Sequence, residues 1–371
     1  MNLDKESRQI FQDSAREWLV DNASITHFRA QRDKQSCVSG HESWQEMAAL
    51  GWPGIMVPED LGGSGLGITE LGLIIEQAGH HLCASPLLST GLIAVSALTL
   101  CQQTDYSQAK LRAIALGELK VALALEENHH HNPQAVSAVA KQHADGWLLS
   151  GEKIHVAEAG SADALLISAR TEDSNRLGLF LVSAENIEIK PLQLIDSRDH
   201  ANIAFDNISV PADALLELGD ESCALLDKVL DRACIGLAAE MLGTATAAFE
   251  MTLEYLKIRE QFGQIIGSYQ ALQHRAAKMY IEIELARSVV EKALQAVDED
   301  SPEVAVLASQ AKALMGDTLQ HITNETIQLH GGIGMTDEHD AGLFIKRARV
   351  TEYLYGSSAY HRDRFATLRG F

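Results

Sequence analysis

Two glycine-rich stretches contain residue types that could hold a phosphate group, but neither has the spacing that this chemistry needs. The stretch GWLLSGEK at 146–153 is close to a phosphate-binding loop, yet Glu152 stands where the lysine should be and the setting is a hairpin. The glycines of VPEDLGGSGLGITELG at 57–72 follow no strand and lack the spacing of a dinucleotide fingerprint. We interpret both stretches as turns.

Three consecutive histidines, His129, His130 and His131, raise the question of a metal ion. Neighbouring residues of one loop cannot all point at the same ion, and no carboxylate or thiol stands at a ligand spacing from them. The sequence therefore predicts a solvated loop and no metal site.

The overall composition excludes several kinds of partner. The chain has 371 residues and a formal net charge of −21, with its acidic residues spread along the whole length. Such a chain repels phosphate backbones and anionic lipid, so we expect neither nucleic-acid nor membrane binding. We find no secretory signal at the start and no apolar stretch of the roughly 20 residues that span a bilayer.

The cysteines indicate a reducing compartment. They are widely spaced, with no CxxC pair and no histidine at zinc spacing, which predicts reduced thiols in a cytoplasmic protein. The five residues are Cys37, Cys83, Cys101, Cys223 and Cys234.

The periodicity of the apolar residues predicts three domains. Residues 1–112 follow a helical pattern, residues 113–215 alternate with a period of two in short runs between turns, and residues 216–371 are helical again. The predicted fold class is therefore a multidomain α+β protein. It has an N-terminal α-helical domain, a middle β-barrel or β-sandwich domain, and a C-terminal domain resembling a four-helix bundle.

Two long helices dominate the C-terminal domain. The first carries apolar residues alternately four and three apart, which predicts one long buried seam. These residues are Leu272, Ala276, Met279, Ile283, Ala286, Val290, Ala293 and Val297. The second helix is predicted to start at Ser301-Pro302-Glu303, because serine caps free amides and proline suits the first position, and to end before Gly331-Gly332.

Four segments resemble the acyl-CoA dehydrogenase family. REQFGQIIGSYQALQHRAA at 259–277 and QLHGGIGMTDEHDAGLFIKRAR at 328–349 are similar to signature segments of that family. WQEMAALGWPGIMVPEDLGGSGLG at 44–67 resembles its N-terminal domain, and GWLLSGEKIHVAEAGSADALLISAR at 146–170 resembles its middle domain. The resemblance therefore covers the whole chain.

The resemblance implies a flavin adenine dinucleotide (FAD) that lies between subunits, with its pyrophosphate and adenine end held by a neighbour. The positions it implies for this role are Arg259, Gln261, Phe262, Gln270, Gln328, Gly331 and Gly332. These residue types suit the role because a guanidinium pairs with phosphate through two hydrogen bonds and glycine permits a close approach of the backbone. The alternative reading is an ordinary helix surface that ends in a glycine cap.

The part of the family pattern that holds the flavin ring is altered here. The family's Thr-Glu-Pro turn and the following Gly-Ser-Asp correspond to residues 125–131, which include the histidine triplet. Its Trp-Ile-Thr run corresponds to His155-Val156-Ala157. The resemblance thus predicts that the chain's own half of the ring site is eroded.

The catalytic base of the family is altered as well. Its Tyr-Glu-Gly-Thr segment corresponds to residues 354–357, which place Tyr355 at the base position. The reaction removes a proton next to a thioester carbonyl, and a carboxylate in a dry pocket suits this step. A phenol with an ordinary pKa of about 10 is a poor base near neutral pH.

Some relatives keep the base on the first helix of the C-terminal domain, at a place that falls near Ala233. The nearest carboxylates are Asp231 and then Glu240, which interrupts the apolar run IGLAAEML. Either one is a candidate base, and each has a plainer reading, as an exposed helix acid for Asp231 and as a paired core or interface acid for Glu240. Arg232 is a candidate contact for the substrate or its CoA group, or else a partner of Asp227.

Two functions remain open at this point. In the first, the chain is an acyl-CoA dehydrogenase that holds FAD, desaturates the α,β bond of an acyl-CoA thioester and passes electrons to an electron-transfer flavoprotein. In the second, it is a non-catalytic subunit that completes the FAD site of an unlike neighbour. Both imply an oligomer, for which the resemblance suggests a tetramer. A different flavin reaction is a third possibility that no residue supports.

Overall fold

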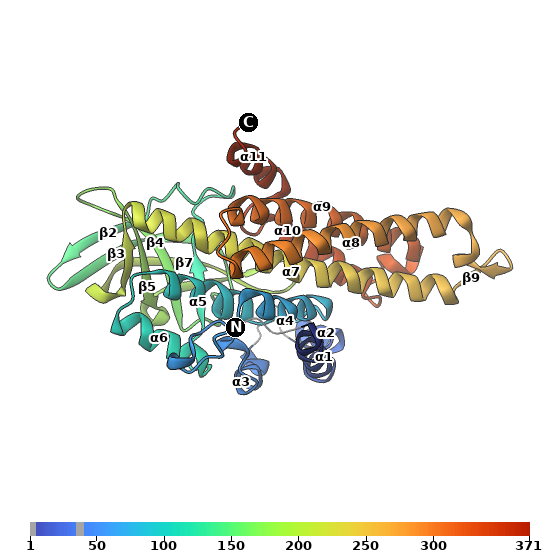
Figure 1. The fold of residues 1–371 in the computed structure, drawn as a ribbon, viewed down its shortest axis with the longest axis horizontal. Coiled ribbons are helices and arrows are strands. Elements are labelled where there is room, and N and C mark those ends of the chain that lie inside the picture. The colour runs from blue at the N-terminus through green and yellow to red at the C-terminus, as the bar shows by residue number, and fades with distance from the viewer. Residues whose placement is uncertain (1–4, 35–40) are drawn as a thin grey trace. The chain divides into compact units, whose positions relative to one another are not determined.

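The computed structural model describes residues 5–34 and 41–371. These residues form two compact units, which are treated separately below. The first contains 30–34, 41–71 and 84–233, and the second contains 5–29, 72–83 and 234–371. The predicted order of a helical region, a β-sheet region and a helical region is confirmed by the order of the elements (Figure 1). The boundaries at residues 112 and 215 stay predictions.

Short helices and one eight-stranded sheet make up the first unit. The sheet has the strand order β6-β7-β3-β2-β4-β5-β8, and β1 pairs with β4 in parallel. Its strands are β1 (Val121–Ala124), β2 (Val139–His143), β3 (Gly146–Ala157), β4 (Ala164–Thr171), β5 (Leu177–Ser183), β6 (Glu188–Gln193), β7 (Asp199–Pro211) and β8 (Leu215–Leu218). Its helices are α3 (His41–Ala49), η1 (Trp52–Gly54), η2 (Glu59–Leu61), η3 (Leu87–Ala94), α5 (Val95–Leu100), α6 (Asp105–Ala115), η4 (Ala184–Asn186) and η5 (Ala212–Ala214).

The pairing of β3 with β7 is interrupted at a position that the family resemblance singles out. Lys153 faces Ile203 and Val156 faces Ala201, so two residues of β3 oppose one residue of β7. His155 lies in this bulge and has a φ of 52°. A bulge turns side chains away from the regular alternation of a strand.

The second unit is helical apart from a small hairpin, and α2, α4 and α7 have residues in both units. Its helices are α1 (Lys5–Asn22), α2 (Ile25–Lys34), α4 (Ile68–His80), α7 (Asp220–Ile258), η6 (Ile266–Ser268), α8 (Gln270–Asp298), α9 (Val304–His330), η7 (Gly331–Met335), α10 (Ala341–Tyr353) and α11 (Ser358–Leu368). The hairpin consists of β9 (Glu260–Gln261) and β10 (Gln264–Ile265).

The long seam predicted on α8 is confirmed over most of its length. Six of the eight residues are buried, namely Met279, Ile283, Ala286, Val290, Ala293 and Val297. Leu272 and Ala276, at the start of the helix, are half-buried. The predicted start of α9 was wrong by a few residues, because Ser301 accepts a bond from the amide of Glu303 in a turn and the helix begins at Val304.

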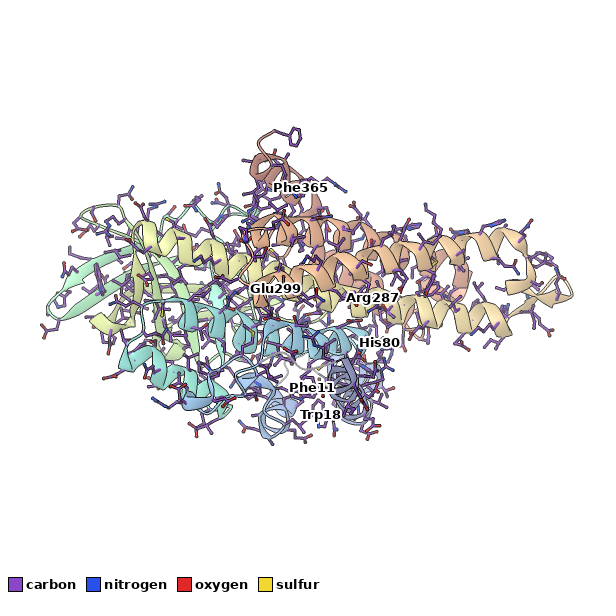
Figure 2. The ribbon with its side chains drawn as sticks, viewed as in Figure 1. Phe11, Trp18, His80, Arg287, Glu299 and Phe365 are labelled. Atoms are coloured by element: carbon purple, nitrogen blue, oxygen red, sulfur yellow. The ribbon has the colours of Figure 1, made fainter. Side chains whose placement is uncertain are left out.

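Close contact and paired charges hold α4 against α7 and α8 in the second unit. A Cβ atom at Gly79 would lie 2.0 Å from the carbonyl oxygen of Glu240, so only glycine permits this approach. Arg287 of α8 bonds Glu76 of α4 at 2.6 Å, and His80 of α4 lies 2.8 Å from Glu250 of α7. Figure 2 labels Arg287 and His80.

Cys83, Cys101, Cys223 and Cys234 are free cysteines in the structure. Cys37 lies outside the described residues. Within the described ranges, no helix combines the length and the apolar character needed to cross a membrane.

A buried histidine makes the sheet sensitive to acid. Burial lowers the pKa of His200 on β7 to about 4, with smaller and opposing effects from Asp196 and Arg198. The folded chain therefore binds this proton less readily than the unfolded chain, whose histidine keeps a pKa near 6.5. The stability that neutral His200 contributes is complete above pH 6.5 and is lost as the pH falls toward 4.

We expect His200→Gln to reduce this acid sensitivity. Between pH 7 and pH 4.5 the free energy of unfolding should fall by about 2 kcal/mol less in the variant than in the unchanged chain. Urea denaturation at the two pH values measures the difference. An equal fall in both proteins would contradict the assignment.

Candidate functional site

Four of the predicted cofactor positions lie at the turn between α7 and α8 (Figure 1). Arg259, Gln261, Phe262 and Gln270 are all exposed, and the ring of Phe262 is 92% exposed. Phe262 and Gly263 form the tip of the β9–β10 hairpin with φ values of 56° and 78°. Two-residue hairpins favour such left-handed turns, but phenylalanine rarely adopts them. The turn thus presents an apolar ring and an exposed guanidinium close together in sequence.

The other three positions lie where α9 ends. Gln328, Gly331 and Gly332 are exposed, and a Cβ atom at either glycine would meet no atom within 4 Å. Gly331 has a φ of 65° and ends the helix. The backbone here is open to close approach by a ligand.

Tyr255 and His330 bring these two groups of residues together within the second unit. Their ring centroids are 4.4 Å apart, and the Tyr255 hydroxyl donates to the His330 carbonyl at 3.4 Å. Nδ1 of His330 donates to Thr326 O at 2.7 Å, and among the described residues its buried Nε2 has no hydrogen-bond partner. Burial lowers the pKa of His330, which keeps the imidazole neutral near pH 7.

Tyr355 lies in a turn whose carbonyl groups point at buried donors. The residue is buried and has a φ of 57°. Its carbonyl oxygen lies 2.9 Å from Nε2 of His361 and accepts a longer contact of 3.7 Å from the thiol of Cys234. Lys312 donates to the carbonyl groups of Glu352 and Gly356 at 2.9 Å each.

Lys312 is fully buried, and this burial lowers its pKa to about 8. The carboxylate of Glu352 accepts from the amide and the hydroxyl of Ser358 at 2.9 and 3.1 Å, so it holds the first turn of α11. Buried side chains of this unit therefore hold the turn around residue 355 through its backbone carbonyl groups. These contacts do not involve the side chain of residue 355.

The candidate base Glu240 forms a buried ion pair. Its carboxylate lies 3.3 Å from the guanidinium of Arg347, and the two side chains are 6% and 1% exposed. The guanidinium also lies over the ring of Phe28, with 5.7 Å between Cζ and the ring centroid. Since a buried charge needs a partner, this pairing fits a structural carboxylate better than a base.

The other two candidates on α7 belong to the first unit. Asp231 is buried and Arg232 is half-buried. Ala233, the position at which some relatives carry the base, is also buried. Glu240 and Tyr355 belong to the second unit.

A buried ion pair lies in the part of the first unit that the family resemblance assigns to the flavin ring. Nζ of Lys153 lies 2.7 Å from Glu127, 2.9 Å from Ser168 Oγ and 3.2 Å from the carbonyl oxygen of Leu125. Burial lowers the pKa of Lys153. Burial acts to raise the pKa of Glu127, but Lys153 and two backbone amides outweigh it and lower this pKa.

A second buried pair follows directly after His155-Val156-Ala157. The carboxylate of Glu158 lies 2.7 Å from the guanidinium of Arg198 and accepts a bond from Ser89. Glu158 has a φ of 62°, and its side chain is 9% exposed. The charged side chains of Glu158 and Arg198 therefore lie in the interior of the first unit.

His129 and His130 are exposed, as expected for a solvated loop, but His131 departs from this expectation. The side chain of His131 is 8% exposed and lies 2.5 Å from Glu126. His129 instead faces His155 of the bulge, with ring centroids 5.8 Å apart. Different partners on either side therefore anchor the loop. Among the described residues, no three histidine, cysteine or acidic side chains are placed to hold a metal ion.

Comparison with known proteins decides the family. The model described as acyl-CoA dehydrogenase, N-terminal domain, matches residues 5–118. The model described as acyl-CoA dehydrogenase, C-terminal domain, matches residues 224–367. The chain belongs to the acyl-CoA dehydrogenase family.

Relatives and solved structures cover nearly the whole chain. Acyl-CoA dehydrogenase FadE12 of Mycobacterium tuberculosis (strain ATCC 25618 / H37Rv) is 28% identical over 364 residues, covering 94% of this chain and 92% of the relative. The structure of a variant of the Tcur3481-Tcur3483 steroid ACAD matches with a TM-score of 0.88 at 30% identity, covering 98% of both chains. The ChsE4-ChsE5 complex from Mycobacterium tuberculosis matches with a TM-score of 0.88 at 24% identity, covering 100% of this chain and 99% of that one.

Sequence reasoning missed several polar residues that contact or adjoin the predicted positions of this acyl-CoA dehydrogenase family member. In the first unit this is Lys153, and in the second unit these are Tyr255, Lys312, His330 and His361. For Lys312 the signal was a single basic residue within the apolar run of α9, a pattern that points to a buried charge with dedicated acceptors.

We expect the Glu240–Arg347 pair to contribute to stability as a unit. Arg347→Met leaves a buried carboxylate without its partner and should lower the free energy of unfolding by about 3 kcal/mol or more. Adding Glu240→Leu should restore most of this loss, because both charges are then gone. Urea denaturation of the single and double variants measures both effects. A loss below about 1 kcal/mol in the single variant would contradict the structural role.

Proposed function

We propose that this chain is a subunit of an FAD-dependent acyl-CoA dehydrogenase that desaturates an acyl-CoA thioester, and that its share is to complete the flavin site of a neighbouring subunit. One contrast carries the proposal. The positions implied for a neighbour's cofactor are exposed and unobstructed, whereas the region implied for the chain's own flavin ring is filled by paired buried charges.

The residues of the second unit fit the phosphate and adenine end of the cofactor. The exposed guanidinium of Arg259 can form two charge-assisted hydrogen bonds to a phosphate. Gly331 and Gly332 leave room for the same group to approach the backbone, and the amide groups of Gln261 and Gln328 supply further donors and acceptors. The exposed ring of Phe262 adds a flat apolar surface against which an aromatic group can pack.

The residues of the first unit do not offer a comparable place for the flavin ring. Where the family resemblance places Trp-Ile-Thr, this chain has His155 in a bulge, Val156 buried and Ala157 without a hydrogen-bonding side chain. Lys153 and Glu127 bond to each other and so have little capacity left for a ligand. The desaturation therefore takes place at a ring and a base that the neighbour holds.

In the assembly, bound FAD supplies the acceptor for the hydride that leaves the β carbon. This chain contributes the Arg259 guanidinium and the open backbone at Gly331 and Gly332, which contact the phosphate and adenine end of that cofactor. The proposal extends to an electron-transfer flavoprotein as the next electron acceptor and to a cytoplasmic location. The relatives described as Tcur3481-Tcur3483 and ChsE4-ChsE5 are named as pairs, which supports an unlike neighbour.

A second candidate function is the self-sufficient dehydrogenase, in which like chains hold FAD and Asp231 is the base. The burial of Asp231, two residues before the place where some relatives keep their base, is the observation that favours it. Arg232 would then contact the CoA part of the substrate. Tyr355 would remain without a role as a base in either case.

We expect Arg259→Ala to weaken FAD binding to the assembled enzyme by roughly 10- to 100-fold, because a charge-assisted pair to phosphate is lost. Titration of the apo-assembly with FAD, followed by flavin fluorescence, measures the affinity. Arg369→Ala, at another exposed arginine of the same unit, is the matched control and should leave the affinity unchanged. Unchanged affinity in Arg259→Ala would contradict the proposal.

We further expect Asp231→Asn to keep the turnover of the assembled enzyme within about threefold, because the base is supplied by the neighbour. A general base contributes typically 100- to 10,000-fold, so a loss of about 100-fold or more would instead support the self-sufficient enzyme. Steady-state desaturation of an acyl-CoA measures the rate. Far-UV circular dichroism of the variant shows whether a loss comes from unfolding.

A further inference from the structure

One arginine near the start of the chain holds the loop between η7 and α10. Nη1 of Arg29, on α2, donates to the carbonyl oxygen of Asp337 at 2.5 Å, and Nη2 lies 2.5 Å from the carboxylate of Asp340. All three residues belong to the second unit. The planar guanidinium carries several donors in a fixed geometry, so one side chain can grip the loop 336–340 at two points.

The loop depends on this contact because it lies at the surface. Residues 336–338 are exposed. Asp337 also lies 4.0 Å from Lys346, a distance at which an exposed pair contributes little to stability. The side chain of Arg29, in contrast, is only 22% exposed, and the adjacent Phe28 is buried. The arginine is therefore the anchored side of the contact, and the loop is the side that it holds.

The loop carries a ring that packs against the end of α9. The ring centroids of His339 and His330 are 4.5 Å apart, and Nδ1 of His339 accepts from the amide of Ala341 at 3.2 Å. The other neighbour of the His330 ring is Tyr255, so three aromatic rings pack in succession. His330 directly precedes Gly331, whose positive φ and open backbone suit the approach of a phosphate group.

We propose that Arg29 is a positioning residue for the FAD of the neighbouring subunit. It acts through the loop and not by contact with the cofactor. By fixing residues 337–340 it sets His339 against His330, and this packing keeps the backbone of Gly331 in the conformation that the phosphate end approaches. The inference deepens the proposed function, on which it rests, by adding a residue of α2 to the same site.

Preorganisation connects the loop to the affinity. A segment that is already held in its binding conformation loses little conformational freedom when the ligand arrives, whereas a loose segment must first be ordered. Without Arg29 the exposed loop has to be ordered by the cofactor itself. The cofactor then binds more weakly, although each group that contacts it is still present.

Titration of the apo-assembly with FAD tests the proposal. Arg29→Gln should raise the Kd about tenfold, because the loop loses both contacts of the guanidinium. Arg29→Lys keeps a charge for Asp340 but not the fork of donors, and should give an intermediate Kd. Arg16→Gln is the matched control, since Arg16 of α1 bonds Gln77 of α4 at 3.1 Å, and should leave the Kd unchanged. An unchanged Kd in Arg29→Gln would overturn the proposal.

Hydrogen exchange of the purified chain separates positioning from a general loss of stability. In Arg29→Gln the amides of Ala341 and Leu343, which are bonded to the loop, should exchange faster, and those in the middle of α7 and α8 should not. Unchanged exchange at the two loop-bonded amides, or faster exchange throughout the unit, would overturn the positioning role.

A double variant shows whether Arg29 acts through the loop. Asp340→Ala combined with Arg29→Gln should bind FAD no more weakly than Arg29→Gln alone, because both changes release the same contact. Additive losses would overturn the proposed route. If Arg259→Ala weakens FAD binding and Arg29→Gln does not, only the positioning role fails, whereas the proposed function fails with it if neither variant has an effect.

Discussion

A charge that is withdrawn from water needs a partner, and this requirement shapes the interior of both units. Lys153 pairs with Glu127 and Arg198 with Glu158 in the first unit, and Arg347 pairs with Glu240 in the second. Each pair joins segments that are distant in the sequence. Removing one partner of such a pair lowers the free energy of unfolding, because it leaves the other charge buried and unpaired. These carboxylates therefore have structural roles.

The same requirement explains how the turn around Tyr355 is held. Around Tyr355 the carbonyl groups of the turn accept from Lys312 and His361. These bonds depend on the backbone and not on the side chain at residue 355. A different side chain at residue 355 is therefore compatible with the same turn.

Much of the fold follows from local pattern, because helices and strands bury apolar residues with a fixed period. The seam of α8 from Met279 to Val297 and the short apolar runs of strands such as β4 were predictable for this reason. The pairing of residues that are far apart in the sequence was not predictable in this way. Nothing near Lys312 in the sequence indicates its acceptors at residues 352 and 356, and nothing near Lys153 indicates Glu127.

The predicted cofactor positions also combine features that the sequence indicates with contacts that only the folded chain shows. Arg259 and Gly331 were recognisable by resemblance, but the Tyr255–His330 contact that joins their surroundings depends on how α7 and α9 pack. Glu240 looked like a candidate base because it interrupts an apolar run. Its partner Arg347 lies more than a hundred residues further along, so only the folded chain reveals the ion pair.

The central claim is that this chain completes a flavin site and does not hold a flavin by itself. The most direct measurement is the visible absorbance of the chain purified alone, after incubation with FAD and gel filtration. The account predicts a colourless protein that retains flavin bands only when a second family member is present. Flavin retained in about equal number to chains of this protein alone would contradict it.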